Sequence, residues 1–331
     1  MSESTENEQK KKDAAIRRDS VKLDQIIKLL FNVSKPTLIN VINGLFNENY
    51  DPDNADVDVI KTATEYVKKN LDIIRADIFL QVTSQDKTKD YHLEFQLAAG
   101  GKNIIVRLLE YDIQYALDNL RLEDDIASAV VRLPKCIVLH FEPSGTIPSK
   151  YRMKVEFPNG TSGEYEADVM KYYDYADKAL VDKKLYNLLP LQLFLLRAEL
   201  EKTHKGKDEQ ARQAAIANAK EMIDKIFDAV TELHQEQKID ANDYDKIGTG
   251  LAEIMKHLDT RYNLNNELIG GIKVIKTLMN KNALRQMEKQ TKIEMATKML
   301  LKNKPMDEII DFTGLREKEI KSIQKNLNKE N

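Results

Sequence analysis

The chain has little of several residue types, and each shortage excludes a class of protein. Its 331 residues include one cysteine, Cys136, and no tryptophan. A lone cysteine excludes an internal disulfide framework and a zinc site of paired cysteines, and it fits a reducing compartment. Residues 1–20 lack the apolar centre of a signal peptide. No stretch approaches the roughly 20 apolar residues that a membrane span needs. We therefore expect a cytoplasmic protein without a membrane partner.

The chain also has no excess of positive charge. Its formal net charge is −3, whereas proteins that bind nucleic acid mainly through charge are strongly basic. Any contact with nucleic acid must therefore use a local basic surface or a metal ion. The glycine-rich phosphate-binding loops of nucleotide-binding proteins and the His-Glu-Xaa-Xaa-His zinc motif are absent as well.

The pattern of apolar residues divides the chain into three parts. We expect residues 1–20 to form a disordered tail, because they are charged and contain almost nothing apolar. The pattern predicts a mixed α/β core over residues 21–201, with helices over 23–46, 103–120 and 185–200. The first of these is interrupted, and we expect Ser34 to cap its second part. From residue 202 to 331 the spacing predicts helices only, with apolar stripes over 216–233 and 244–258 and further helices from about Asn282 and Met306.

The first strands of the core carry unexpected polar residues. Residues 73–82 alternate as one strand, and residues 91–97 follow after a short polar link, which predicts a hairpin. Further strands are expected at 136–141, 150–157 and 163–169, with an Asn-Gly turn between the last two. In the strand 91–97 (YHLEFQL), the residues Glu94 and Gln96 share one face and Asp77 lies on the preceding strand.

Two carboxylates on neighbouring strands repel each other unless a cation neutralises them. If the two strands pair, Asp77 lies next to Glu94, and a hard divalent ion such as Mg²⁺ would relieve the repulsion. The alternative is a hairpin whose polar face is exposed to solvent, and the spacing alone does not separate the two. On the following helix Arg107, Tyr111 and Gln114 form a polar stripe, beside an apolar stripe of Ile105, Leu108, Leu109, Ile113, Ala116 and Leu117.

The order of these motifs resembles the PD-(D/E)XK nuclease superfamily. More narrowly, it resembles the Rpn group of recombination-promoting, transposase-like nucleases. The resemblance rests on RADIFLQV (75–82), YHLEFQ (91–96) and VRLLEYDIQY (106–115), with support from LDQIIKLLF (23–31) and from residues 299–324. It implies a restriction-endonuclease-like mixed sheet flanked by helices, followed by an all-helical C-terminal region. It also implies a metal-dependent endodeoxyribonuclease whose partner is DNA and which acts in recombination or on mobile elements.

The resemblance also implies a role for each matching residue. Asp77, Glu94 and the backbone carbonyl of Phe95 would hold Mg²⁺, with Mn²⁺ or Ca²⁺ as substitutes, and Gln96 would help to position the attacking water. The polar side chains of the next helix, Arg107 and Tyr111, would contact the phosphate or support the site. Glu65, expected on a helix before the first strand, is a weaker candidate metal ligand.

Two positions depart from the superfamily pattern. Ala76 stands where the superfamily has proline, and Gln96 stands where it has lysine. An amide is neither a base nor a cation, so a lysine-dependent step is in doubt, although glutamine is ordinary in the Rpn group. His92 shares the face of Glu94, either as a metal ligand or, as we expect, as a hydrogen-bonded histidine within the sheet.

The C-terminal residues predict a helical hairpin, with helices over 306–312 and 316–326 around Thr313-Gly314-Leu315. This spacing resembles a helix-turn-helix, and residues 281–331 hold 12 Lys and Arg against 8 Asp and Glu. The alternative is a hairpin that only packs on its neighbours.

Two other functions stay open at this stage. The chain could keep the nuclease fold without catalysis, as a DNA-binding or oligomeric regulatory protein. It could also be an assembly protein whose helical half forms a homodimer, with the acidic residues exposed on the surface.

Overall fold

The computed structural model describes residues 24–271, except 62–64, 68–72, 76–77, 86, 97–103, 121–128, 144–146 and 207, and residues 292–330, except 294, 298 and 302–303. The chain divides into two compact units, Met1–Ile272 and Lys273–Asn331. The boundary expected after residue 201 therefore falls inside the first unit. Several features expected from the sequence lie outside the described residues. They are the tail over 1–20, Ala76, Asp77 and the start of the helix near Asn282.

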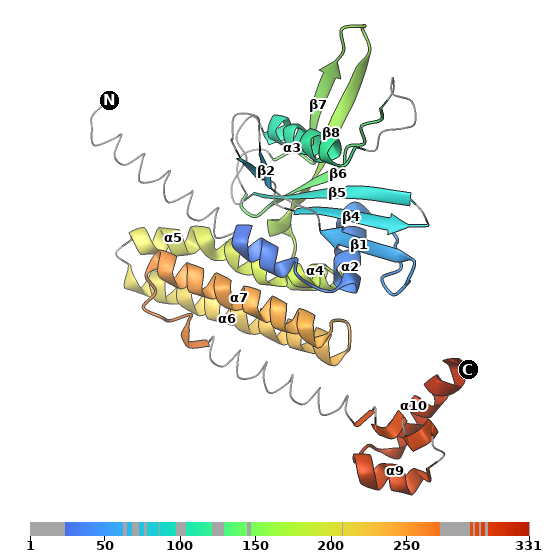
Figure 1. Ribbon diagram of the computed structural model, residues 1–331. Coiled ribbons are helices and arrows are strands. Elements are labelled where there is room, and N and C mark those ends of the chain that lie inside the picture. Colours follow the sequence, from blue (N-terminus) through green and yellow to red (C-terminus); the bar gives the residue numbers. More distant parts are fainter. Residues whose placement is uncertain are drawn as a thin grey trace. The chain divides into compact units, whose positions relative to one another are not determined.

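A six-stranded mixed sheet forms the centre of the first unit (Figure 1). Its strands, in spatial order, are β1 (Val57–Lys61), β4 (Ile78–Ser84), β5 (Lys87–Gln96), β6 (Lys135–His140), β8 (Ser162–Lys171) and β7 (Lys150–Glu156). The first three strands are antiparallel, β5, β6 and β8 are parallel, and β7 is antiparallel to β8. The mixed α/β class expected for the core is confirmed.

The β4–β5 hairpin is confirmed, with Ile78 opposite Leu93 at the end of the described pairing. The strand expected over 73–82 is wrong in its bounds. Its first part, β3 (Ile73–Arg75), pairs instead with β2 (Glu65–Val67) in a separate two-stranded sheet. Glu65, which was expected on a helix, therefore lies in a strand. Apolar alternation alone does not reveal where a strand changes its pairing partner.

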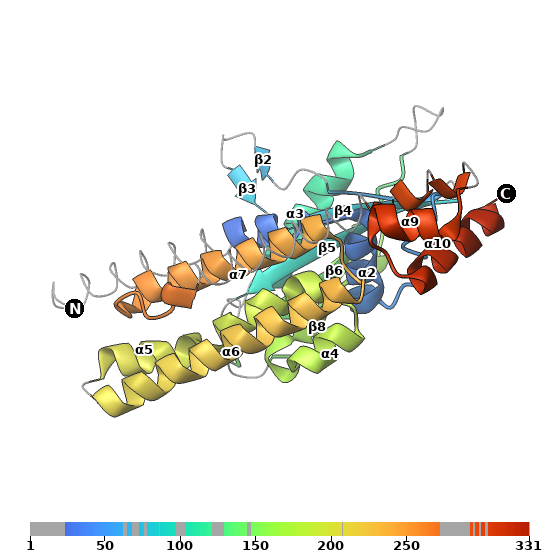
Figure 2. The same cartoon turned by 90° about the horizontal axis from the view of Figure 1, so that it is seen from below.

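Both faces of β5 are covered, which explains why five consecutive residues of this strand, 91–95, are buried. On one face Tyr91 and Phe95 pack against Phe46 and Phe31, with ring centroids 4.8 and 5.8 Å apart. Phe46 ends α2 (Lys35–Phe46). The opposite face turns His92 and Glu94 toward α3 (Ile104–Asp118), which also packs against β7 and β8. Figure 2 shows the unit from a second direction.

Helix α3 confirms the helix expected over 103–120, but its buried stripe differs from the expected one. The residues with little exposure are Ile104, Leu108, Asp112, Tyr115 and Ala116. Ile113 and Leu117, which were expected in the apolar stripe, are 39% and 48% exposed. The buried face of α3 includes Asp112 because the carboxylate of this residue has polar partners inside the protein. Its hydrogen bonds are therefore kept when it is buried.

The apolar segment after the sheet is not the single helix expected over 185–200. It forms a 3₁₀ helix, η2 (Tyr186–Leu196), that contains Pro190, and then α5 (Arg197–Lys205). Proline has no backbone N–H to donate within an α-helix, which favours the break. Two shorter elements, η1 (Tyr172–Asp174) and α4 (Asp177–Asp182), precede it.

Two long helices, α6 (Glu209–Gln235) and α7 (Ala241–Tyr262), pack against each other and against η2 (Figure 1). Their apolar stripes, which were expected over 216–233 and 244–258, are confirmed. Ile223, Ile226, Ile247 and Leu251 are at most 5% exposed within the single chain. These stripes are therefore covered without a second copy of the chain.

The second unit contains the helical hairpin expected near the C-terminus. Helix α9 (Met306–Thr313) ends at Gly314, whose φ of 67° lies in the left-handed region that glycine adopts readily. Helix α10 (Glu317–Glu330) follows, and Ala296, Ile309, Leu315 and Ile320 form a small core. The geometry of the hairpin is confirmed, and its contact with DNA stays a prediction. Within the described parts of the chain, no helix combines the length and apolar character needed to cross a membrane.

Candidate functional site

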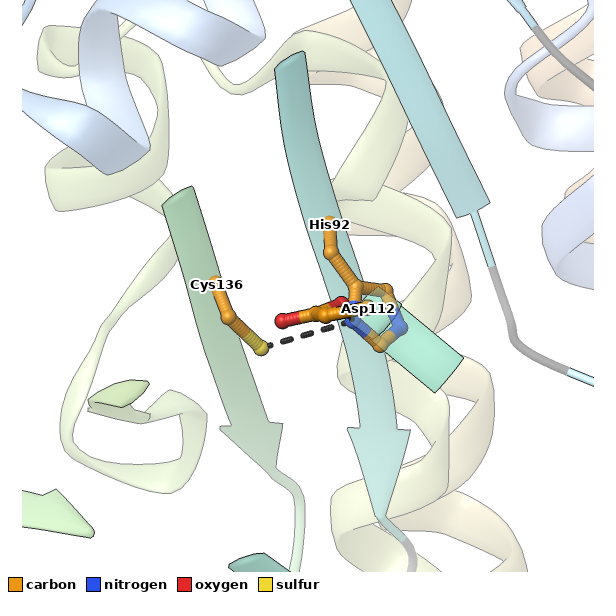
Figure 3. A group of neighbouring side chains, drawn as sticks. All are labelled: His92, Asp112 and Cys136. Carbon is orange, nitrogen blue, oxygen red and sulfur yellow. Dashed lines mark hydrogen bonds and ion pairs between the residues drawn. The ribbon is translucent and has the colours of Figure 1, made fainter. Parts of the chain in front are cut away.

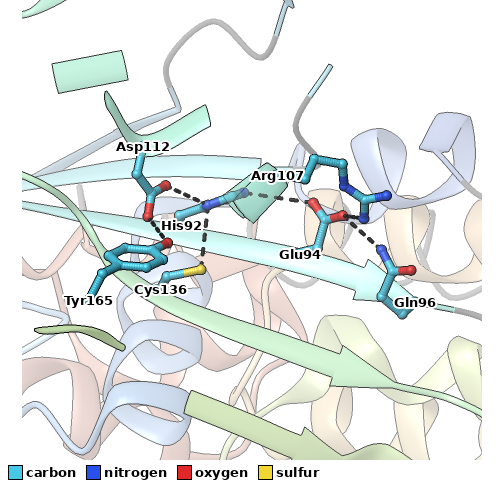
Figure 4. A network of polar contacts seen from close by, with 7 residues as sticks. All are labelled: His92, Glu94, Gln96, Arg107, Asp112, Cys136 and Tyr165. Carbon is cyan, nitrogen blue, oxygen red and sulfur yellow. Dashed lines mark hydrogen bonds and ion pairs between the residues drawn. The ribbon is translucent and has the colours of Figure 1, made fainter. Parts of the chain in front are cut away.

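Strand β5 and helix α3 bring together several of the polar residues singled out in the sequence (Figure 4). His92, Glu94 and Gln96 alternate along β5 toward α3, and Arg107 reaches Glu94 from the first turns of α3. Glu94 is 4% exposed. The solvent-facing hairpin considered above is therefore wrong for this carboxylate.

The two oxygens of Glu94 have different surroundings. Oε1 accepts hydrogen bonds from Arg107 Nη2 at 2.6 Å and from Gln96 Nε2 at 2.7 Å. Oε2 lies 3.8 Å from His92 Nε2, beyond hydrogen-bond distance. Burial alone would raise the pKa of Glu94, but its contacts with His92 and Arg107 outweigh burial and hold the pKa below its usual value. Glu94 is therefore an anion at neutral pH, with one oxygen fully engaged.

Arg107 and Tyr111 form the outer side of the site. The Arg107 side chain is 41% exposed although its tip bonds to Glu94. Its guanidinium carbon lies 6.0 Å from the centroid of the Tyr111 ring, a cation–π distance. Tyr111 in turn packs against Phe79 and Tyr115. Arg107 can therefore reach both the buried carboxylate and an anion at the surface.

Behind Glu94 lies a second polar cluster, made by His92, Asp112 and Cys136 (Figure 3) together with Tyr165 (Figure 4). His92 Nδ1 lies 2.7 Å from Asp112 Oδ1, and the Tyr165 hydroxyl donates to Asp112 Oδ2 at 2.5 Å. Cys136 Sγ on β6 lies 3.5 Å from the same Nδ1. His92 and Asp112 are fully buried and Cys136 is 2% exposed, so this cluster is shielded from water.

The charges of this cluster follow from its burial. Burial by itself lowers the pKa of His92, but Cys136 and Asp112 outweigh it and raise that pKa well above its usual value. Burial also raises the pKa of the Cys136 thiol. His92 Nδ1 therefore lies beside the two groups, Cys136 and Asp112, that favour the protonated imidazole.

His92, Asp112 and Cys136 are also residue types that bind metal ions, and their ligand atoms lie within 4.8 Å of one another. However, two atoms that each bind an ion at about 2.1 Å lie about 3.0 to 4.2 Å apart. The 2.7 Å between His92 Nδ1 and Asp112 Oδ1 is shorter than this range and is typical of a charge-assisted hydrogen bond. The cluster therefore holds a proton at this position rather than an ion.

The residues expected at the site fall into three groups. Glu94, Gln96 and Arg107 are brought into direct contact, and Tyr111 lies beside Arg107. Asp77 lies outside the described residues. The backbone of the weaker candidate, Glu65, lies in β2, where it pairs with Arg75. The expected third protein ligand is the backbone carbonyl of Phe95, whose ring turns to the other face of the sheet.

Sequence reasoning missed two residues, Asp112 and Tyr165. It placed His92 on the correct face and expected a hydrogen-bonded sheet histidine, which the Asp112 contact confirms. A signal for Asp112 existed, since it lies four residues after Leu108 on the same face of α3. Tyr165 lies 53 positions from Asp112 along the chain, and no spacing rule links them.

The comparisons with protein-family models, curated proteins and solved structures gave no significant match. The chemistry of the site therefore has to be argued from its own geometry.

The donor atoms of the site suit a divalent cation. Glu94 Oε2 lies 3.8 Å from His92 Nε2 as an ion pair, and it belongs to a carboxylate that is ionised at neutral pH. Mg²⁺ is usually held by one or two carboxylates together with waters. Glu94 can supply one of them, and a second acidic residue is needed nearby.

Proposed function

We propose that the chain is a metal-dependent endodeoxyribonuclease of the Rpn type, with a restriction-endonuclease-like PD-(D/E)XK fold, linked to recombination or mobile elements. The observation that carries the proposal is the buried, ionised Glu94, held by Gln96 and Arg107 at one end of β5. These residues belong to the motifs on which the family resemblance rests. A mixed sheet in which one helix, α3, connects the parallel pair β5 and β6 is compatible with that fold.

The proposal assigns the second carboxylate to Asp77. Asp77 directly precedes Ile78, and Ile78 pairs with Leu93, the neighbour of Glu94. In an antiparallel pair, one further step of the same register would bring Asp77 opposite Glu94. The proposal therefore requires that the register continues by one residue.

Each of the remaining residues has a role that its contacts support. A Mg²⁺ ion bound by Asp77 and Glu94, with the Phe95 carbonyl, would supply an activated water and neutralise charge on a phosphodiester. Gln96 would orient that water with its amide. Arg107, half-exposed next to Glu94, is suited to contact a substrate phosphate, and Tyr111 would hold Arg107 through its ring.

One observation favours a second candidate function. The ion pair between Arg107 and Glu94 neutralises the buried carboxylate without any metal ion. A chain in which this pair is permanent would keep the fold and lose catalysis, as a DNA-binding or oligomeric regulatory protein. The two candidates differ in whether a divalent ion competes with Arg107 for Glu94.

Cleavage of supercoiled plasmid separates the two candidates. The assay measures cleavage by the purified wild type with Mg²⁺ and with EDTA. The Asp77→Ala and Glu94→Ala variants are measured in parallel. We expect nicking or linearisation that requires Mg²⁺ and that each substitution reduces by at least about a hundredfold, because metal-assisted hydrolysis supplies several kcal/mol of transition-state stabilisation.

A second assay on the same samples measures DNA binding. An inactive wild type that still binds DNA would favour the regulatory protein. Cleavage that survives both substitutions would show that neither carboxylate takes part in the reaction, which would contradict the proposed site.

A further inference from the structure

The two ring nitrogens of His92 differ, since one has a hydrogen-bond partner and the other makes only a longer ion-pair contact. Nδ1 faces Asp112, whereas Nε2 is fully buried and has no hydrogen-bond partner among the described residues. A buried polar atom without a partner costs free energy. Such an atom at a functional site indicates a group that binds there.

Nε2 points at Glu94 Oε2 (Figure 4). The separation between Nε2 and Oε2 is 3.8 Å. This distance is too long for a hydrogen bond, and it falls inside the range of about 3.0 to 4.2 Å for two ligands of one ion. The same criterion excluded an ion on the Nδ1 side, where the separation is 2.7 Å.

The surroundings of His92 match those of metal-binding histidines in general. A histidine that binds a metal usually donates its other ring N–H to a carboxylate, which fixes the orientation of the ring. Asp112 takes this place on Nδ1, and Tyr165 fixes Asp112 in turn. The ring also stacks on Phe79, with centroids 4.3 Å apart and an interplanar angle of 20°. Its Nε2 is therefore held in one direction before any ion binds.

We propose that His92 Nε2 and Glu94 Oε2 are ligands of the same divalent ion, with Asp112 and Tyr165 as the groups that orient His92. The inference rests on the proposed function, since it adds a ligand to the metal site at Glu94. It also changes the expected ion. Mg²⁺ prefers oxygen ligands, whereas an imidazole favours transition-metal ions. The site would therefore bind Mn²⁺ or Zn²⁺ more tightly than Mg²⁺. On binding, the ion takes the place of the proton on Nε2.

Calorimetric titration with Mn²⁺ and with Mg²⁺ tests the assignment. We expect the wild type to bind Mn²⁺ more tightly than Mg²⁺. His92→Gln should weaken Mn²⁺ binding by about 10- to 100-fold and Mg²⁺ binding much less. Asp112→Asn should weaken Mn²⁺ binding by about 10-fold, the lower end of the range for groups that orient a ligand. His234→Gln is the matched control, because His234 is a buried histidine on α6.

Electron spin resonance of bound Mn²⁺ gives a second readout, and its wild-type arm does not depend on any variant folding. A directly bound imidazole produces a nitrogen coupling in the spin-echo modulation, which we expect in the wild type and not in His92→Gln. Wild-type Mn²⁺ without nitrogen coupling, or unchanged affinity in His92→Gln, would overturn the inference.

Two further variants separate the ways in which the inference can fail. If Glu94→Gln abolishes Mn²⁺ binding while no nitrogen coupling is found, the proposed metal site stands and only His92 is excluded from it. If the wild type binds no divalent ion, both proposals fail. Cys136→Ser should bind Mn²⁺ as the wild type does, and its loss of binding would place the ion on the Nδ1 side and overturn the assignment to Nε2.

Discussion

At the scale of single residues, the interior of the site balances two carboxylates against two cationic groups. Glu94 and Asp112 are both at most 4% exposed. Glu94 bonds to Arg107, and His92 lies between the two carboxylates, 2.7 Å from Asp112 and 3.8 Å from Glu94. Removing one member of such a group leaves a buried charge uncompensated, which usually costs more than the whole group contributes. Single substitutions here should therefore be tested for folding as well as for activity.

The lowered pKa of Glu94 predicts how stability depends on pH. The folded-state pKa lies below the usual value of 4.5, so the unfolded chain binds more protons at acidic pH. The stabilisation by ionised Glu94 is complete above the pKa of this residue in the unfolded chain. It is lost as the pH falls through the pKa of Glu94 in the folded protein. We expect the wild type to be more stable than Glu94→Gln at neutral pH, and the difference to shrink below about pH 4.5.

Urea unfolding of both proteins at a series of pH values checks this expectation. Glu164→Gln is the control, because Glu164 is an exposed residue of β8. A difference between wild type and Glu94→Gln that stays constant down to the acid transition would show that the pKa of Glu94 is not lowered.

At the scale of elements, a buried carboxylate connects the start of α2 to α7. Asp243 is fully buried and accepts hydrogen bonds from Ser34 N, Ser34 Oγ and Thr37 Oγ1 at 2.5 to 2.6 Å. Ser34 precedes α2 as expected, but its side chain makes no hydrogen bond to the backbone of that helix. The Ser34 side chain therefore bonds to a residue 209 positions away instead of capping α2.

We predict that Asp243→Ala destabilises the protein by about 2 to 4 kcal/mol, because it leaves several buried donors without an acceptor. The neighbouring Asp245 is exposed on the same helix, so Asp245→Ala should change the free energy of unfolding by less than about 0.5 kcal/mol. Equal urea midpoints for the two variants would contradict the role given to Asp243.

The elements that the sequence predicts well are those with a regular apolar period. The alternation in β5, the Asn-Gly turn between β7 and β8 and the length of α3 were each visible in local spacing. The failures have two causes. The break within η2 has a local signal, Pro190 itself, whereas the burial of Asp112 depends on partners that lie elsewhere in the chain. A periodic pattern treats an aspartate as solvent-facing, whereas a distant tyrosine and histidine make its burial favourable.

The candidate site was predictable only in part for the same reason. Glu94, Gln96 and Arg107 belong to short motifs on adjacent elements, so the sequence placed them together correctly. It left the role of His92 open, because the partner of each ring nitrogen depends on how β5 and α3 pack.

At the scale of the whole molecule, the chain divides into two compact units, Met1–Ile272 and Lys273–Asn331. The proposed site lies entirely in the first unit, and α6 and α7 belong to that unit through their contacts with η2. The second unit has a core of its own. Each unit therefore has the packing that an independently folding part of the chain requires.

We predict that a chain shortened to residues 1–272 keeps the unfolding temperature and the divalent-ion affinity of the first unit. A helix-turn-helix role of α9 and α10 would appear as weaker DNA binding by the shortened chain, with unchanged metal binding. Calorimetry of both chains measures the two quantities. Loss of metal binding in the shortened chain would show that the second unit contributes to the site.

The measurement that tests the central proposal most directly is metal-dependent cleavage of plasmid by the wild type and by Glu94→Gln, with Glu164→Gln as the matched control. Divalent ions should activate the wild type and the control equally. Glu94→Gln, folded by circular dichroism, should be at least about a hundredfold slower, because it removes a carboxylate that the proposal assigns to the metal ion. Equal cleavage by folded Glu94→Gln and wild type would contradict the assignment of the reaction to this site.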